Sequence, residues 1–270
     1  MDAISDFGSI VTFVSEKVGL PIMTTHYTFV CGMMFIALSL LVPQVLDLSP
    51  NKAMEANPKA LVNRIVASIH AALMFFLAIS YWIRSYPAIL QSPAGTVADP
   101  QQIFAVEIML GYLLYDCLID TMWPKDDGTW DLSMVVHHIM GAISLGAVRY
   151  YHSVPGYFYN TIVFLAEAST PALHSSWIMY SLKKTGTLEY QLIGWSLVGL
   201  FFIFRVLLAP WLVHKMWTER SVWDNEPAYM FEGNFAISVV FTVMQLKWFF
   251  DLIKMAMKTK GMAKDKKHPE

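Results

Sequence analysis

Two adjacent histidines, His137 and His138, lie inside an apolar stretch of this chain, and Glu167 lies inside the next apolar stretch. Ionisable groups are costly in hydrocarbon and are usually retained where they face a protein interior or a water-filled cavity. If the two stretches form an antiparallel hairpin that turns near residue 153, His138 and Glu167 lie about 15 and 14 residues from the turn, at similar depth. These residues therefore predict a polar site inside a bundle of membrane helices.

A contact between histidine and a carboxylate has three chemical uses. The carboxylate can orient the imidazole, which then acts as a general base or a nucleophile in acyl transfer. Both groups can also ligate a metal ion, but adjacent histidines on a helix point about 100° apart and no His-x-x-x-His spacing occurs, so we expect no metal. The third use is structural, since a polar contact between membrane helices contributes about 0.6–2 kcal/mol.

Further polar side chains fall within the apolar stretches and are candidates for lipid or substrate binding. Asp116 and Asp120 share one helix face because they are four residues apart, and water access near the end of their stretch is an alternative explanation for them. The full set of candidates is His70, Asp116, Asp120, Ser169, Thr170, His174, Arg205 and Asn234.

The composition indicates an all-α polytopic membrane protein. Hydrophobic residues make up 56% of the 270 residues and charged residues only 15%, and the apolar stretches reach the length of roughly 20 residues that a membrane helix needs. The net charge of −2 gives no basic field for nucleic acid. Both cysteines, Cys31 and Cys117, fall within apolar stretches, which argues against a disulfide framework.

Seven transmembrane helices are predicted, and Pro171 and Pro210 are expected to kink two of them because proline lacks a backbone donor. We divide the chain into an N-terminal interfacial segment with the first transmembrane helix (1–57), a six-helix domain (58–258) and a basic tail (259–270). The predicted helices are 24–46, 62–86, 103–123, 132–152, 155–182, 188–217 and 228–258.

The distribution of lysine and arginine predicts the orientation of the protein in its membrane. With seven helices, twelve basic residues fall on the side of the C-terminal tail and five on the other. Because basic loops stay in the cytosol, the C-terminus is expected to be cytosolic. The tail ends in Lys266-Lys267-His268-Pro269-Glu270, which resembles a dilysine retrieval signal without matching it, and a basic segment near anionic lipid is the simpler interpretation.

Several short runs, taken in order, resemble the TLC domain family of TRAM, Lag and CLN proteins. The matching runs are Asn63 to Ala71, Gly111 to Asp116, His137-His138, Ala166 to Pro171, Phe202 to Arg205 with Pro210, and Trp248 to Phe250. The resemblance covers about residues 58–258 and is closest to the small TLC-domain-containing proteins with a Glu-x-Ser-Thr-Pro run.

The resemblance implies a six-helix bundle around a cavity the size of an acyl chain, with one extra helix before it. Ceramide synthases of the family use a histidine pair and following aspartates to transfer a fatty acyl group from coenzyme A to a sphingoid amine. His137 and His138 match that pair, whereas Glu167-Ala168-Ser169-Thr170 stands in place of the synthase Asp-x-Ser-Asp run.

The resemblance therefore favours a protein that binds acyl lipid in its bundle and takes part in membrane lipid homeostasis, in the endoplasmic reticulum. Its expected partners are membrane lipids, with no cofactor and no nucleic acid. The alternatives are an acyltransferase that takes acyl-CoA as co-substrate and uses His137, His138 and Glu167, and a cargo receptor or structural subunit without enzyme activity.

Overall fold

A computed structural model describes residues 26–45, 58–85, 98–121 and 130–265, and these residues form helices joined by short turns, with no strand among them. The all-α prediction is confirmed. The predicted interfacial segment and the last tail residues lie outside the described residues.

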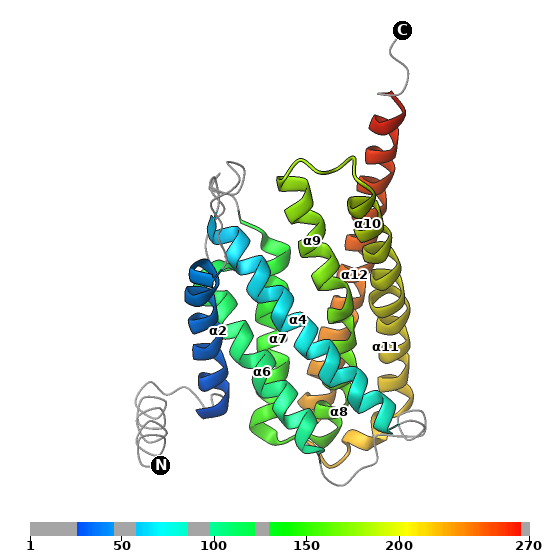
Figure 1. The fold of residues 1–270 in the computed structure, drawn as a ribbon. Coiled ribbons are helices and arrows are strands. Elements are labelled where there is room, and N and C mark those ends of the chain that lie inside the picture. Colours follow the sequence, from blue (N-terminus) through cyan, green and yellow to red (C-terminus); the bar gives the residue numbers. More distant parts are fainter. Residues whose placement is uncertain (1–25, 46–57, 86–97, 122–129, 266–270) are drawn as a thin grey trace. The chain divides into compact units, whose positions relative to one another are not determined.

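Seven helical stretches follow one another within the described residues (Figure 1). Three of them are interrupted by or end in a 3-10 or π segment. The first four of the seven stretches are α2 (His26–Val45), α4 (Pro58–Ser85), α6 (Pro100–Asp116) with η1 (Cys117–Thr121), and α7 (Leu132–Tyr151). The fifth is α8 (Val154–Val163) with η2 (Phe164–Ser169) and α9 (Thr170–Ser181), and the sixth is α10 (Leu188–Phe201) with η3 (Phe202–Leu207) and α11 (Leu208–Thr218). The seventh is α12 (Ala228–Asp265), which is preceded by η4 (Arg220–Trp223).

Six of these stretches are long and apolar enough to cross a membrane. The exception is the predicted helix 155–182, in which the 3-10 segment η2 separates α8, of 10 residues, from α9, of 12. Neither piece alone reaches the roughly 20 residues that a single spanning helix needs. A break in a membrane helix requires neighbouring groups to satisfy the freed backbone.

Both prolines that were expected to disturb helices lie directly after an irregular segment. Pro171 is in the first turn of α9, after η2, and Pro210 is in α11, after the π segment η3. Proline cannot donate to the carbonyl four residues before it, so the preceding turn loses a bond and changes its pitch. Helix α12 also differs from expectation, since it continues to Asp265 into the predicted tail, through residues such as Met, Lys and Ala that favour helix.

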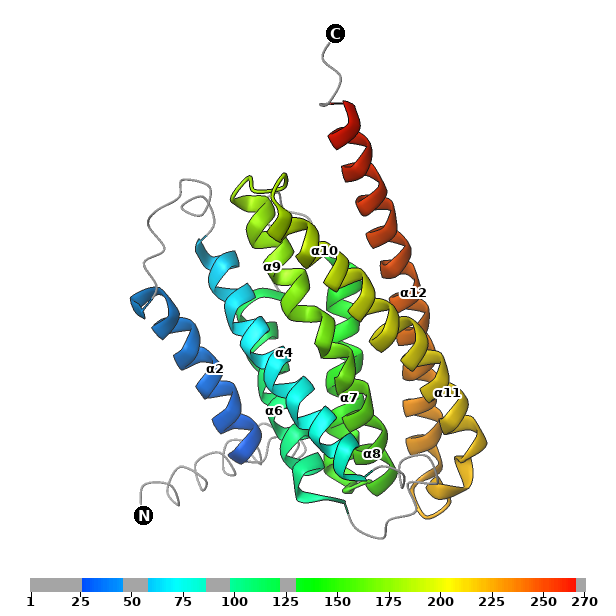
Figure 2. The same ribbon diagram turned by 45° about the vertical axis from the view of Figure 1, so that its right-hand side comes forward.

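The chain divides into two compact units, each described by itself. Unit 1 takes the described parts of 1–38, 77–162 and 216–237, and unit 2 those of 39–76, 163–215 and 238–270. In unit 1, α6 and α7 pack side by side and run antiparallel (Figures 1 and 2). In unit 2, α9 packs against α10.

Glycine lets α2 approach α6 closely in unit 1. A Cβ atom added to Gly111 would lie 2.7 Å from the backbone nitrogen of Gly32 and 2.8 Å from the carbonyl oxygen of Thr28. Beside this crossing, the rings of Phe35 and Tyr112 meet edge to face at 5.4 Å.

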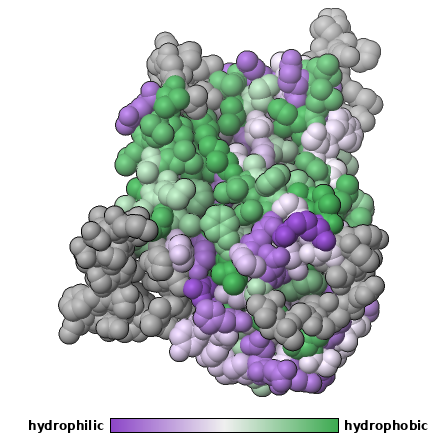
Figure 3. Space-filling view, turned by 60° about the horizontal axis from the view of Figure 1, so that its bottom comes forward, coloured by the Kyte–Doolittle hydropathy of each residue, from purple (hydrophilic) through white to green (hydrophobic). Residues whose placement is uncertain are grey.

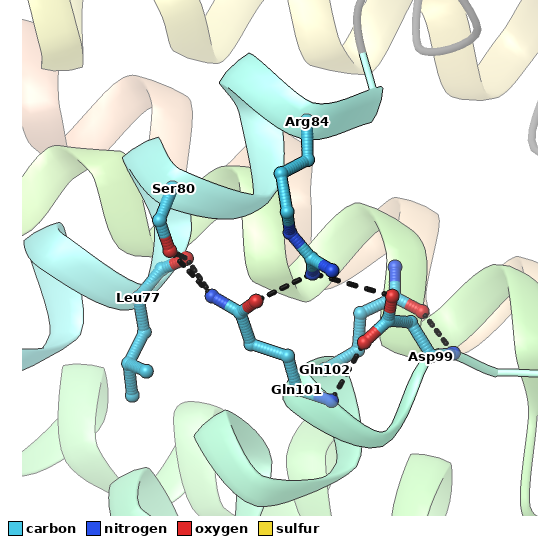
Figure 4. Close-up of polar contacts among 6 residues, drawn as sticks. All are labelled: Leu77, Ser80, Arg84, Asp99, Gln101 and Gln102. Carbon is cyan, nitrogen blue, oxygen red and sulfur yellow. Dashed lines mark hydrogen bonds and ion pairs between the residues drawn. The ribbon is translucent and has the colours of Figure 1, made fainter.

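Polar side chains join the end of α4 to the start of α6, also within unit 1 (Figure 4). The side chain of Asp99 accepts a hydrogen bond from the backbone N–H of Gln101 and caps α6. The Gln101 amide donates to the carbonyl of Leu77 at 2.7 Å and to Ser80 Oγ at 2.6 Å, while its oxygen accepts from Arg84. One glutamine therefore bonds to three residues of the last turns of α4.

Large hydrophobic side chains are exposed on the surface of both units, including Ile83 in unit 1 and Trp195 in unit 2, each about 70% exposed. Figure 3 shows a face on which hydrophobic residues cover broad areas and hydrophilic residues form smaller groups. Soluble proteins rarely expose so much apolar surface, and a lipid environment explains it here.

Candidate functional site

The central contact of the candidate site in unit 1 joins His138 of α7 to Asp116 of α6. The distance between His138 Nδ1 and Asp116 Oδ2 is 3.0 Å, and both residues are 8% exposed. The hydroxyl of Tyr112, one turn before Asp116, donates to Asp116 Oδ1 at 3.2 Å. The carboxylate thus bonds to groups from two helices, and its burial replaces the water access considered for it above.

Local helix geometry places this contact. Asp116 is the last residue of α6 before the π segment η1, and π turns inside helices are frequent at functional sites. The α-helix α7 begins at the N-cap Asp131, whose side chain accepts from the backbone N–H of Met134. His137 is half-buried, and its ring lies 5.4 Å from that of His138 at an angle of 48°.

Asp116 can orient the imidazole of His138 for acid–base chemistry. Since Nδ1 faces the carboxylate, Nε2 is the ring nitrogen that would exchange a proton with a substrate. The sequence predicted Glu167 in this role. Glu167 belongs to unit 2, and its contact with His138 in unit 1 stays a prediction. Asp120 lies in η1, and its side chain is outside what the structure describes.

A second polar cluster, in unit 2, surrounds the guanidinium of Arg205 in the π segment η3. Its Nε donates to the carbonyl of Ala166 at 3.1 Å and to Ser169 Oγ at 2.9 Å. Its Nη2 donates to Thr170 Oγ1 at 3.0 Å, and its Nη1 to Gln245 Oε1 on α12 at 3.2 Å. Arg205 therefore connects the broken stretch η2–α9 to α12.

Thr170 links this arginine to the predicted catalytic carboxylate. Its hydroxyl donates to Glu167 Oε2 at 2.8 Å while it accepts from Arg205. The structure thus brings together four predicted site residues, Glu167, Ser169, Thr170 and Arg205. Ser169 and Thr170 bond directly to Arg205, and Glu167 is linked to it through Thr170. The carbonyl of Ala166, which also accepts from Arg205, lies in the helix break.

The valine variant of Thr170 tests the structural importance of this link. Thr170→Val keeps the shape of the side chain but leaves the Arg205 Nη2 donor and the Glu167 acceptor without their shared hydroxyl, so we expect a loss of about 1–3 kcal/mol. Thermal unfolding of the detergent-purified protein measures it. Thr242→Val is the matched control, because that hydroxyl bonds only to the backbone of its own helix, at Ser238. Equal unfolding temperatures for the two variants would contradict the role of Thr170.

His174 and His70 occupy other positions in unit 2. Arg64 Nη1 lies 3.2 Å from His174 Nδ1, and the guanidinium carbon of Arg64 lies 4.1 Å from the centre of the Trp177 ring. His174 therefore accepts through Nδ1 and joins α9 to α4. His70 is 2% exposed in the core face of α4.

Asn234 belongs to unit 1 and is also engaged with protein groups. Ser144 on α7 donates to Asn234 Oδ1 at 2.7 Å, and Asn234 Nδ2 donates to the carbonyl of Met230 at 2.8 Å. The pair joins α7 to α12 in the manner of polar contacts between membrane helices.

The sequence analysis missed a buried ion pair in unit 1. Glu107 on α6 accepts a hydrogen bond from Arg149 Nε on α7 and another from the hydroxyl of Thr28 on α2. The side chain of Glu107 is 3% exposed. Arg149 Nη1 also lies 3.3 Å from His152 Nδ1 at the end of α7. Three helices of unit 1 meet at this carboxylate.

The clusters above are pairs or arginine-centred networks, and no three of the His, Cys, Asp and Glu side chains that the structure describes are grouped as ligands for one metal ion.

Comparison with known protein families shows which family the chain is related to. The family model described as TLC domain (TRAM, LAG1, CLN8) matches residues 61–254, from α4 to α12.

The chain belongs to the TLC domain family. No curated protein and no solved structure gives a significant match. With six candidate membrane spans, this TLC-domain protein is a multi-pass integral membrane protein. The matched residues include every predicted site residue, and helix α2 precedes them.

Proposed function

We propose that this TLC-domain protein binds an acyl lipid within its helices and takes part in membrane lipid homeostasis, with the polar head of the lipid at His138, Asp116 and Tyr112. The observation that carries the proposal is the buried His138–Asp116 contact between two candidate membrane spans. A buried ionisable pair in a membrane helix is costly and marks a functional site by default. The pair offers both an acceptor and a proton-exchanging ring to a hydroxyl or amine of a lipid.

The Glu167-Ala168-Ser169-Thr170 run supports placement among the small TLC-domain proteins rather than the ceramide synthases. Ser169 and Thr170 hold the guanidinium of Arg205, and Thr170 also bonds to Glu167. Where the synthases have a second carboxylate, this chain therefore has a hydroxyl that anchors an arginine. We propose lipid binding, not acyl transfer, as the main activity for this reason.

Acyl transfer from acyl-CoA is the second candidate, and the orientation of His138 by Asp116 favours it. His138 Nε2 would take the proton from the hydroxyl or amine of an acceptor lipid, whose oxygen or nitrogen attacks the thioester carbonyl carbon. The carbon–sulfur bond then breaks, and the imidazolium returns the proton to the departing coenzyme A thiolate. Asp116 stabilises the imidazolium between these steps.

Location and orientation complete the proposal. The excess of basic residues on the side of the C-terminal tail supports a cytosolic C-terminus. Family membership supports the endoplasmic reticulum.

Mass spectrometry of the purified protein beside its His138→Ala variant separates the candidates. For lipid binding we expect a lipid adduct under native conditions in the wild type, at least tenfold weaker in His138→Ala, and lost on denaturation. Acyl transfer would instead appear, after addition of acyl-CoA and an acceptor lipid, as an acylated acceptor lipid and free coenzyme A with the wild type and not with His138→Ala. The control is Ser181→Ala, which removes a half-buried hydroxyl in unit 2 at the end of α9. This variant should bind lipid as the wild type does. No lipid in any sample would contradict the proposal and favour a scaffold or cargo receptor.

A further inference from the structure

Helix α12 carries three charged residues on an exposed face within unit 2. Lys247 Nζ lies 2.8 Å from Asp251 Oδ2, and Lys254 Nζ lies 3.8 Å from Asp251 Oδ1. The side chains of Lys247, Asp251 and Lys254 are 66%, 46% and 73% exposed. We call these three residues the α12 charged stripe. Neither lysine is a buried group facing the protein interior, although Lys247 falls within the predicted transmembrane helix 228–258.

The stripe lies opposite the side of α12 that packs on the protein. Gln245 bonds to Arg205, and the ring of Phe249 stacks on that of Phe201 at 6.0 Å. Lys247 follows Gln245 by two residues, or about 200° around the helix. Val240 and Val243 continue the stripe towards the start of α12, and both are exposed apolar residues. In a membrane protein these exposed valines are expected to face lipid. Exposed charged side chains begin on this face at Lys247, beside the exposed apolar residues Phe250, Met255 and Met257.

With the hydrocarbon taken to begin at Ala228, the length of the helix places Lys247 near its other edge. Lys247 is 19 residues after Ala228, the first residue of α12, and a rise of about 1.5 Å per residue gives about 28 Å. The hydrocarbon core of a bilayer is about 30 Å thick. Lys254 lies about 10 Å further along, within or just beyond the headgroup layer. Exposed charges at these positions avoid the cost that they would have in hydrocarbon.

We propose that the α12 charged stripe binds the anionic headgroups of phospholipids in the leaflet at the C-terminal end of α12. Two lysines outnumber one aspartate, so the stripe has a net positive charge. Asp251 sits between the lysines at ion-pair distance from both and holds them on one face, about 10 Å apart along the axis. Phosphate and carboxylate groups of lipids such as phosphatidylserine complement such a surface. This proposal is independent of the His138–Asp116 site.

The test compares lipid retention by the full-length protein in nanodiscs of phosphatidylcholine with and without phosphatidylserine. Native mass spectrometry after release counts the bound phosphatidylserine. A lysine near an anionic surface contributes about fivefold in affinity, so we expect the double variant Lys247→Gln/Lys254→Gln to lose binding about 25-fold. Asp251→Asn should increase binding, because it removes the competing negative charge. Both effects should weaken at high ionic strength.

The matched control removes two exposed lysines elsewhere in unit 2, in the turn between α9 and α10, as Lys183→Gln/Lys184→Gln. An equal loss in this control would overturn the proposal, since it would show a general effect of charge. Unchanged binding in the stripe variant would overturn it as well. If the stripe variant keeps its lipid but loses self-association, the stripe is a protein interface and the proposal is wrong.

Discussion

Replacing Glu107 by alanine is expected to destabilise the protein by about 3–5 kcal/mol, because removal of one partner from a buried ion pair leaves the other charge uncompensated. The carboxylate of Glu107 is almost fully buried and bonds to Arg149 and to Thr28. Its loss leaves Arg149 without its buried anion and removes the hydrogen bond between Thr28 of α2 and α6. Thermal unfolding in detergent, followed by size-exclusion chromatography, measures the effect.

Two further variants make this prediction specific. Glu232→Ala removes an exposed carboxylate from α12 in the same unit and should shift stability by less than about 0.5 kcal/mol. The double variant Glu107→Gln/Arg149→Met removes both charges together and should recover part of the loss, as uncharged replacements of buried ion pairs do. If the unfolding temperature of Glu107→Ala is not lower than that of Glu232→Ala, the ion pair does not stabilise the protein.

Alanine at Gly111 is expected to force α2 away from α6. The added Cβ would lie 2.5 Å from Cys31 Cβ and within 2.8 Å of two backbone atoms of α2. Backbone atoms cannot move aside as a flexible side chain can, so the helix itself must shift. Overpacking of this kind costs about 1–3 kcal/mol, and the shift also opens the contact between Phe35 and Tyr112.

Thiol labelling measures this displacement directly. In a Cys117→Ser background, Cys31 is the single cysteine, and it is half-buried. Gly111→Ala should therefore increase its rate of reaction with a maleimide, along with lowering the unfolding temperature. The control is Gly233→Ala, where an added Cβ meets nothing within 4 Å and alanine favours the helix. Unchanged labelling of Cys31 in Gly111→Ala would contradict the close approach of the helices.

The helices were predictable because membrane helices have a strong signal in composition. The predicted 132–152 corresponds to α7 at Leu132–Tyr151, and 188–217 corresponds to α10–α11 at Leu188–Thr218. Pro171 predicted a disturbance in the helix 155–182, and η2 lies directly before this proline. The separation into two helices was not predicted, because the residues around Glu167 are apolar enough to continue a regular helix. The extension of α12 to Asp265 was missed for the opposite reason, since hydropathy ends there while helix propensity does not.

The partners of the site residues were harder to predict, because spacing gives depth in a bundle but not which helices are neighbours. The hairpin argument was applied to the helices of His138 and Glu167. The same argument applied to the preceding hairpin finds both ion pairs between α6 and α7. Asp116 and His138 lie eleven residues either side of residue 127, and Glu107 and Arg149 lie 21 residues either side of residue 128. The hydrogen bonds of Arg205 could not be predicted from residue spacing about a hairpin turn, because their geometry depends on the π segment η3.

The π segment η3 has a consequence for how the sequence can change. A π turn holds one residue more than an α turn, so the Phe202–Leu207 segment behaves as a one-residue insertion within an otherwise regular helix. Loss of one residue there would restore a regular helix but turn everything after it by about 100°. Helices α10 and α11 could then no longer both direct their packing faces towards the helices that they contact now. Sequences related to this one therefore cannot change the length of η3 by one residue without a compensating change further along the helix.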